Sequence, residues 1–124
     1  MDFLLEHSIG GNAALLEIKR PAAKLLTKNP YRGNDTFAPS SELVAAVSQI
    51  LIYRDTIVAE NTSTLNVFVP SCVVLIGNYG GELDSDEKSR CFELYRSSLN
   101  GISIITYDEL FTRLQKILDV LHGE

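Results

Sequence analysis

The run Ser71–Gly77 limits the possible folds of this chain more than any other segment. It reads Ser-Cys-Val-Val-Leu-Ile-Gly, and a strand that is apolar on both faces is typical of a parallel sheet covered on both sides. A second short apolar run, at 102–105, is also the right length for a buried strand. Helical patterns follow both runs, so the sequence predicts an α/β fold with helices on both faces of a mixed sheet.

The first twenty residues predict a β-hairpin. Residues 2–7 and 13–20 are apolar enough to form strands, and the Ser-Ile-Gly-Gly-Asn segment between them supplies turn residues. Pro21 has no backbone N–H to donate, so the second strand is expected to end there. Leu16 and Ile18 are expected to point into the core.

Two segments in the middle of the chain predict helices. Ser40 or Ser41 would cap a helix of roughly 16–19 residues, because a serine oxygen can accept a hydrogen bond from the first helical turn. A further helix is expected to begin with a capping box of Asp84 and Glu87 and to end near Leu99.

A third helix is expected at the end of the chain. Thr106 and Glu109 have the spacing of a capping box, and the apolar residues that follow recur with helical periodicity. We expect this helix to bury the side chains of Leu110, Phe111, Leu114, Ile117, Leu118 and Leu121.

Two connecting segments are expected to be largely irregular. Residues 22–39 contain two prolines and a glycine, with one helical turn expected at most, near 22–27. The glycine-rich segment 77–86 matches neither the P-loop nor the EF-hand pattern. It is therefore predicted to be a flexible connector.

Composition excludes several classes of protein. A length of 124 residues suits one domain, and no apolar run approaches the length of a membrane span. The chain starts with acidic residues where a signal peptide would be basic. Cys72 and Cys91 are expected to be buried reduced thiols. Together these features predict a cytoplasmic protein with no membrane partner.

The distribution of charge leaves two interpretations open for one basic segment. The net charge of −5 argues against non-specific binding of nucleic acid. However, residues 18–34 carry five basic side chains and no acid, namely Lys19, Arg20, Lys24, Lys28 and Arg32. This segment is either a phosphate-binding flank or an ordinary solvated surface.

Glu17, Lys19 and Asp2 are the residues that carry candidate chemistry. Alternation along a strand places Glu17 and Lys19 on one face, about 6.6 Å apart, and pairing within the hairpin can bring Asp2 beside Glu17. Two carboxylates and the Ile18 carbonyl would form a hard-oxygen site for Mg²⁺ or Mn²⁺. Lys19 would then orient or activate a water. Taken alone, the pair Glu17 and Lys19 is also compatible with a solvent-facing charged stripe.

Gln49 and Tyr53 form a second candidate element. They are four residues apart and therefore share one face of the expected helix. Ala45 and Ala46, one turn earlier, are small enough to let this helix approach the sheet. The pair would then face Glu17, or would form a half-buried polar face with satisfied hydrogen bonds.

Five segments occur in an order that is shared with a known family. They are Asp2-Phe3-Leu4, Leu16–Pro21, Gln49-xxx-Tyr53, Val74–Gly77 and Ile105–Leu110. This combination resembles the nuclease domain of the Shedu anti-phage defence family, over roughly residues 2–121.

The resemblance implies a PD-(D/E)xK, restriction-endonuclease-like fold and a metal-dependent DNase activity against phage or other foreign DNA. It places the catalytic residues at Asp2, Glu17, Lys19, Gln49 and Tyr53. Met1 stands where the motif has proline, and the family's helix before the first strand and its N-terminal regulatory region are absent. Residues 1–124 are thus expected to be a single nuclease domain, either excised from the C-terminal end of a longer protein or a short natural version.

Two classes of function remain open. One is a DNA endonuclease or nickase, with an RNA-directed nuclease as a weaker variant; the other is a non-catalytic assembly or sensor module on the same fold. Homo-oligomerisation is expected, also through regions outside this chain. Because chain ends fray unless they are held, Asp2 is expected to be poorly positioned, and the isolated chain to bind metal weakly.

Overall fold

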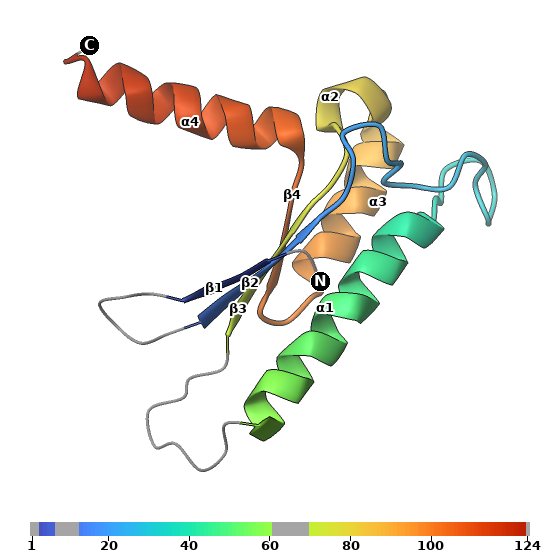
Figure 1. Cartoon of the computed structure of the whole chain (residues 1–124). Coiled ribbons are helices and arrows are strands. Elements are labelled where there is room, and N and C mark those ends of the chain that lie inside the picture. The colour runs from blue at the N-terminus through green and yellow to red at the C-terminus, as the bar shows by residue number, and fades with distance from the viewer. Residues whose placement is uncertain (1–2, 7–12, 61–69, 124) are drawn as a thin grey trace.

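The fold is an α/β arrangement built on one mixed sheet (Figure 1). The computed structural model describes residues 3–6, 13–60 and 70–123. Its elements are, in order, β1 (Phe3–Glu6), β2 (Ala13–Ile18), α1 (Ser41–Glu60), β3 (Ser71–Leu75), α2 (Tyr79–Glu82), α3 (Asp86–Ser97), β4 (Ile102–Ile105) and α4 (Tyr107–Leu121).

The described strands lie in the order β1-β2-β3-β4. β1 and β2 are antiparallel, with Phe3 opposite Leu16, which confirms the predicted pairing of the two hairpin strands. β2, β3 and β4 are parallel to one another, and the predicted strand at 102–105 is confirmed. Parallel neighbours need crossover connections, and α1 and α3 lie within the two that this sheet requires.

The core lies between one face of the sheet and the helices α1 and α3, which lie on the same side of it (Figure 1). The strands bury Leu15, Cys72, Val74, Ile102 and Ile104, the helices bury Leu43, Ala46, Val47, Ile50 and Phe92, and all are at most 6% exposed. Ridges of aliphatic side chains from α1 therefore fill the space above β2 and β3.

The second face of the sheet contradicts the prediction of helices on both faces. Its side chains Leu16, Ile18, Val73, Leu75 and Ile105 are only half-buried. No helix within the described chain lies over them, since α1 and α3 share the other side and α4 leads away (Figure 1). An apolar run can predict that both faces need cover, but it does not specify which segment supplies it.

Serine side chains cap the first turns of α1 and α3. The Ser40 hydroxyl oxygen accepts a hydrogen bond from the Leu43 N–H at 3.0 Å, which confirms the predicted start of α1. α3 is capped by Ser85, whose oxygen accepts from the Lys88 N–H at 3.2 Å. The predicted capping box of Asp84 and Glu87 is therefore wrong: Asp84 instead forms an ion pair with Lys88 at 3.1 Å.

The segment 77–86 is not the flexible connector that was predicted. It contains α2, and the Glu82 carboxylate at the end of α2 accepts hydrogen bonds from the Leu25 N–H at 2.7 Å and the Leu26 N–H at 2.9 Å. These bonds fasten the irregular segment 21–40 to α2. No helical turn forms near 22–27, because the backbone donors there bind this distant carboxylate.

α4 also departs from its prediction. None of its residues is buried, so the expected burial of Leu110, Phe111, Leu114, Ile117, Leu118 and Leu121 is wrong. No described helix is both long enough and apolar enough to span a lipid bilayer.

Gly77 is the residue at which the chain turns away from β3. Its φ is +67°, a conformation that side chains with a Cβ rarely adopt. A Cβ there would lie 2.8 Å from the Ala23 carbonyl oxygen and 2.9 Å from the Leu25 side chain. Glycine thus lets the segment after β2 pass directly against the end of β3.

We predict that Gly77→Ala lowers the free energy of unfolding by about 2–4 kcal/mol, because it adds backbone strain to a steric clash. Urea unfolding measures the change. Gly81→Ala is the matched control, since a Cβ at Gly81 meets nothing within 4 Å; equal stability of the two variants would contradict the steric account.

Candidate active site

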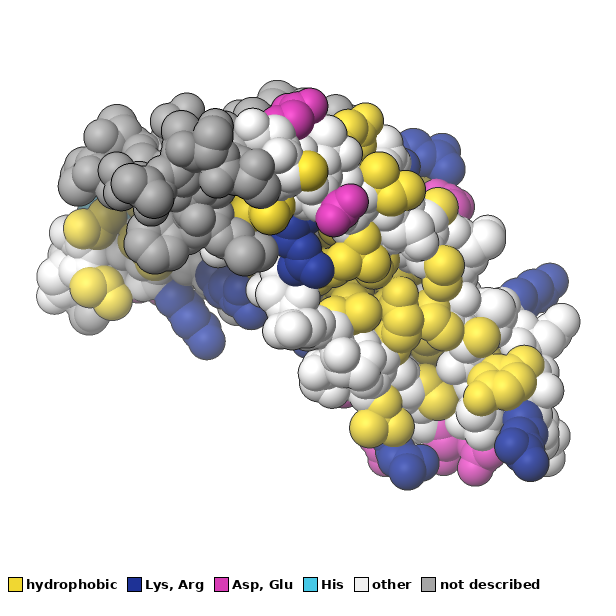
Figure 2. All heavy atoms as spheres, turned by 90° about the horizontal axis from the view of Figure 1, so that it is seen from below, with side chains coloured by type: hydrophobic (Ala, Val, Ile, Leu, Met, Phe, Trp, Pro, Cys, Tyr) yellow, Lys and Arg dark blue, Asp and Glu magenta, His cyan; other side chains and the backbone are white. Residues whose placement is uncertain are grey.

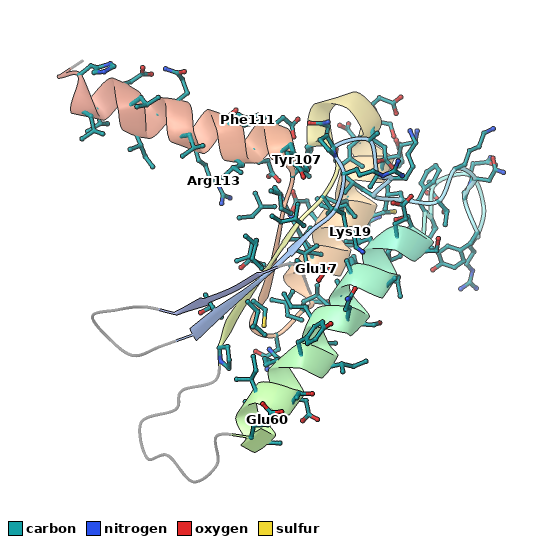
Figure 3. All side chains as sticks on the ribbon, viewed as in Figure 1. Glu17, Lys19, Glu60, Tyr107, Phe111 and Arg113 are labelled. Carbon is teal, nitrogen blue, oxygen red and sulfur yellow. The ribbon has the colours of Figure 1, made fainter. Side chains whose placement is uncertain are left out.

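Glu17 and Lys19 lie together at the end of β2 (Figure 3). The Glu17 side chain is only 2% exposed, and the Lys19 ammonium is 3.4 Å from its Oε1. Glu17 shares its face with buried Leu15, toward α1, whereas Leu16 and Ile18 lie on the half-buried face. The prediction that Leu16 and Ile18 point into the core is therefore wrong, and Glu17 is not part of a solvent-facing stripe.

A carboxylate buried this deeply requires a compensating charge. Moving an ionised carboxyl group out of water costs several kcal/mol unless cations or donors replace the solvent. Lys19 supplies a positive charge, and its own side chain remains 32% exposed. The pair therefore combines a buried anion with a cation that solvent, and any ligand approaching from it, can reach.

The backbone of Lys19 is held from two sides. Its N–H donates to the Leu75 carbonyl at 2.8 Å, which continues the pairing of β2 with β3. The Tyr107 hydroxyl, from the first turn of α4, donates to the Lys19 carbonyl at 2.5 Å. The position of the ammonium group thus depends on the sheet and on the start of α4 together.

α1 brings Gln49 and Tyr53 to the same region. Both are half-buried, their side chains hydrogen-bond to each other, and Tyr53 is near enough to Glu17 to interact with its charge. Fully buried Ala46 is the small residue on the sheet side of α1, whereas Ala45 is exposed. The structure therefore gathers Glu17, Lys19, Gln49 and Tyr53, while Asp2 lies outside the described residues.

The donor chemistry of this group suits a hard divalent cation. Carboxylate and carbonyl oxygens are the ligands that Mg²⁺ and Mn²⁺ prefer, and Glu17 is followed directly by Ile18, whose carbonyl is the predicted additional ligand. Among the described residues no three His, Cys, Asp or Glu side chains form a metal-binding cluster. Glu17 is thus the one predicted carboxylate ligand that lies within the described residues.

A second polar cluster, which sequence reasoning missed, joins α2, α3 and α4. Arg96 on α3 donates to both carboxylate oxygens of Glu93 and of Glu109, at 2.7–2.9 Å, and to the Ile104 carbonyl. Hydrogen bonds to Glu109 and Glu93 raise the pKa of Arg96. The only local signal was the three-residue spacing of Glu93 and Arg96; Glu109 comes from another element.

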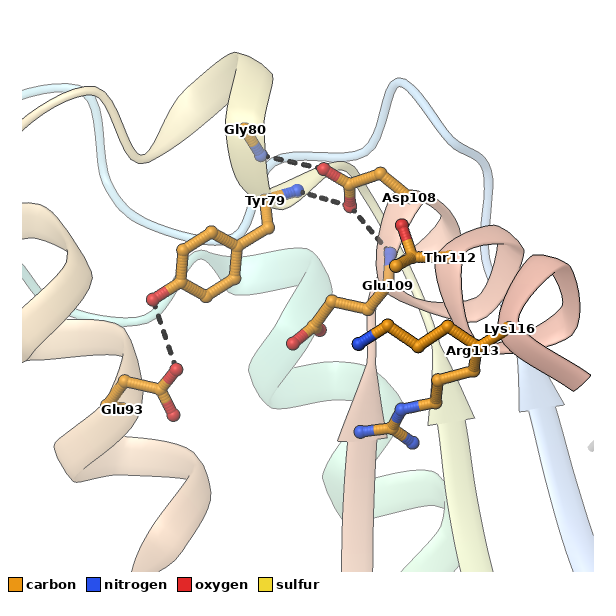
Figure 4. A pocket seen from close by; sticks show the side chains of 8 residues that line it. All are labelled: Tyr79, Gly80, Glu93, Asp108, Glu109, Thr112, Arg113 and Lys116. Carbon is orange, nitrogen blue, oxygen red and sulfur yellow. Dashed lines mark hydrogen bonds between the residues drawn. The ribbon is translucent and has the colours of Figure 1, made fainter. Parts of the chain in front are cut away.

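Asp108 adds further hydrogen bonds between α4 and α2. We call this polar cluster between α2, α3 and α4 the α4 joint. Thr106 and Glu109 form the predicted capping box, and the Asp108 carboxylate accepts from the Tyr79 N–H at 2.9 Å and the Gly80 N–H at 2.8 Å (Figure 4). Asp108 therefore ties the start of α4 to α2, as expected for an acid whose role is structural.

An open cavity of about 520 Å³ lies at this joint. Its lining, drawn in Figure 4, consists of Tyr79, Gly80, Glu93, Asp108, Glu109, Thr112, Arg113 and Lys116. The three acids already bind Arg96, Tyr79 or backbone N–H groups. The cavity thus follows from the joint between helices, and it includes none of the residues gathered around Glu17.

We predict that Asp108 makes stability depend on pH between about 4 and 2. Burial alone would raise its pKa, but hydrogen bonds from the Gly80 N–H, the Thr106 hydroxyl and the Tyr79 N–H outweigh burial and lower the pKa to about 2. A lowered folded-state pKa gives stability that is present above the unfolded value near 4 and is lost as the pH falls toward 2.

Asp108→Asn should therefore lower the free energy of unfolding at pH 7 by about 1–2 kcal/mol and flatten its decline below pH 4. Urea unfolding across this pH range measures both effects. An unchanged pH profile in the variant would show that Asp108 does not stabilise the joint through its charge.

Comparison with known proteins agrees with the order of elements and motifs. A family model described as "Shedu protein SduA, C-terminal" matches residues 1–111. The Shedu protein SduA of Bacillus cereus (strain B4264) is 31% identical over 135 residues, covering 99% of this chain and 35% of that protein. The chain thus spans about a third of the length of this curated relative, and it belongs to the Shedu family.

Proposed function

We propose that this chain is a divalent-metal-dependent DNA endonuclease or nickase domain that acts in anti-phage defence. The observation that carries the proposal is the buried Glu17 carboxylate with the Lys19 ammonium 3.4 Å away, at the end of a central strand. Membership in the Shedu family supports the defence role. A PD-(D/E)xK type of fold agrees with the mixed sheet and with the position of Glu17 and Lys19 in it.

Asp2, Glu17 and the Ile18 carbonyl would hold Mg²⁺ or Mn²⁺. The β1–β2 register pairs Phe3 with Leu16, and in the sequence Asp2 precedes Phe3 while Glu17 follows Leu16. When bound, such a cation makes a coordinated water more acidic and neutralises charge on a phosphate. Val74, the buried partner of Glu17 in the β2–β3 register, and buried Leu15 on the same face of β2 would limit competing solvent at its carboxylate.

Lys19 would act on the attacking water and on the charge that develops at the scissile phosphate. Its ammonium can donate a hydrogen bond to a water oxygen while it remains paired with Glu17. The Leu75 carbonyl and the Tyr107 hydroxyl fix the backbone that carries it. Gln49 and Tyr53 would position Glu17 and contact the substrate from α1. The outcome would be hydrolysis of a phosphodiester bond without a covalent enzyme intermediate.

Lys24 and Lys28 would bind DNA phosphates beside this site. They line a cavity of about 590 Å³ whose lining also includes Lys88, Glu82 and Asp84. Glu82 is occupied by two backbone N–H groups and Asp84 by Lys88, so neither acid needs the two lysines to satisfy it. The lining carries three lysines and two acids, and this local excess of positive charge supports phosphate binding here despite the net charge of −5 of the whole chain.

The test of metal binding and chemistry uses Glu17→Gln and Lys19→Ala. Glu17→Gln should lose both Mn²⁺ binding and the nicking of supercoiled plasmid DNA. Lys19→Ala should keep Mn²⁺ binding but lose cleavage at least 100-fold, since its role is on the water. Isothermal titration and a plasmid-nicking assay measure the two properties, and Lys116→Ala is the control for loss of one positive charge.

Two outcomes would contradict this assignment. If Lys19→Ala loses Mn²⁺ affinity as completely as Glu17→Gln, the division of roles between the two residues is wrong. If Glu17→Gln binds Mn²⁺ no differently from the unmodified chain, and the unmodified chain does not cleave DNA, the chain is a non-catalytic assembly or sensor module. Preferential cleavage of RNA would instead assign an RNA-directed nuclease.

The double variant Lys24→Ala/Lys28→Ala should weaken DNA binding similarly for all sequences. If both lysines contact phosphates, the slope of log affinity against log salt concentration should become shallower by about two. Fluorescence anisotropy with a labelled duplex at several salt concentrations measures this slope. A slope equal to that of Lys116→Ala would place the DNA elsewhere.

A further inference from the structure

Residues 27–38, which we call the 27–38 loop, project beyond the first turn of α1 (Figure 1, light blue to cyan). Two backbone hydrogen bonds cross this loop. The Thr27 N–H donates to the Ala38 carbonyl at 2.8 Å, and the Tyr31 N–H donates to the Thr36 carbonyl at 2.9 Å. The loop is therefore a narrow ribbon of two chain segments with a defined backbone.

Both ends of the 27–38 loop are fixed to the rest of the molecule. Just before the loop, the Leu25 and Leu26 N–H groups donate to the Glu82 carboxylate. Just after it, the Ser40 N–H donates to the Leu25 carbonyl at 2.9 Å, and an antiparallel bridge pairs Leu26 with Pro39. The loop can therefore present a side chain at a fixed place although its own tip is not buried.

Tyr31 is the aromatic residue at the exposed end of this loop. Residues 31–35 are all exposed, and Tyr31 itself is 67% exposed. Among the described residues, no other aromatic ring stacks on the ring of Tyr31. A tyrosine ring is mainly apolar, and it gains free energy when a partner covers its faces. Tyr31 therefore offers a fixed, uncovered stacking surface to a planar ligand.

Positive charges flank Tyr31 within the loop. Lys28 and Arg32 are both exposed, and the single acid of the loop, Asp35, accepts a hydrogen bond from the Thr36 hydroxyl at 3.2 Å. At this end of the molecule, Figure 2 shows Lys and Arg side chains beside hydrophobic ones. An exposed aromatic ring between cations suits single-stranded nucleic acid, because the ring stacks on a base while the cations bind the backbone phosphates.

The 27–38 loop and the candidate active site lie on one continuous stretch of chain. Tyr31 follows Lys19 by twelve residues, and a chain of that length spans at most roughly 40 Å. One turn of a DNA duplex is about 34 Å long. Tyr31 and Lys19 can therefore contact the same stretch of DNA, with Lys24 and Lys28 between them in the chain.

We propose that the 27–38 loop is a second DNA contact, in which Tyr31 stacks on an unpaired base while Lys28 and Arg32 bind the neighbouring phosphates. Inside a duplex, each base face is covered by the next base pair. An aromatic ring therefore reaches a base face only where a base is unpaired or turned out of the helix. The preferred substrate class is DNA whose pairing is interrupted near the cleaved bond. This proposal rests on the proposed function for its choice of DNA as the partner.

Fluorescence anisotropy without divalent metal tests the proposal with two labelled duplexes of equal length, one fully paired and one with a central mismatch bubble. The chain should bind the bubble duplex roughly tenfold more tightly. Tyr31→Ala should remove this preference but keep the slope of log affinity against log salt concentration, because stacking on a base releases no counterions. Tyr31→Phe keeps the ring and should keep the preference. Ile52→Ala is the matched control, since Ile52 on α1 is 66% exposed.

Two results would overturn this role of Tyr31 and leave the proposed function intact, because plasmid nicking is measured separately. One is equal affinity of the unmodified chain for the two duplexes, and the other is a preference for the bubble that Tyr31→Ala retains. Absence of both DNA binding and cleavage would instead contradict the proposed function and this proposal together. Tighter binding of single-stranded RNA than of DNA of the same sequence would overturn DNA as the partner of the loop.

Discussion

The buried ion pair of Glu17 and Lys19 is the interaction around which the rest of the structure is arranged. A carboxylate that is 2% exposed costs free energy, and it is tolerated because a cation lies 3.4 Å away. The backbone that carries this cation is held by the Leu75 carbonyl on β3 and by the Tyr107 hydroxyl on α4. The pair therefore depends on β2 lying beside β3 and on the start of α4 lying against the end of β2.

Local signals in the sequence were enough to predict several elements. Two apolar segments on either side of turn residues predicted which two strands pair, and the spacing of Thr106 and Glu109 predicted the start of α4. Features that depend on distant partners could not be predicted in this way. The Glu82 carboxylate accepts hydrogen bonds from backbone N–H groups 56 and 57 residues away. No local pattern in the sequence shows that Glu82 would bind this irregular segment.

The candidate site shows the same limit. A two-residue spacing put Glu17 and Lys19 on one face of β2, but β2 is apolar on both faces, so alternation could not tell that Leu15 rather than Leu16 faces α1. Likewise, helical periodicity identified an apolar stripe on α4 but not what it packs against. A pattern reports that a face is apolar, while burial depends on where the other elements lie.

A crystal structure of this chain with Mn²⁺ and a DNA duplex tests the central claim most directly, because manganese can be located by its anomalous scattering. The account predicts a manganese peak about 2.0–2.4 Å from a Glu17 carboxylate oxygen, with the Lys19 ammonium beside the scissile phosphate. Manganese held only by the acids of the α4 joint, Glu93, Asp108 and Glu109, or manganese absent from Glu17 at saturating concentration, would contradict it.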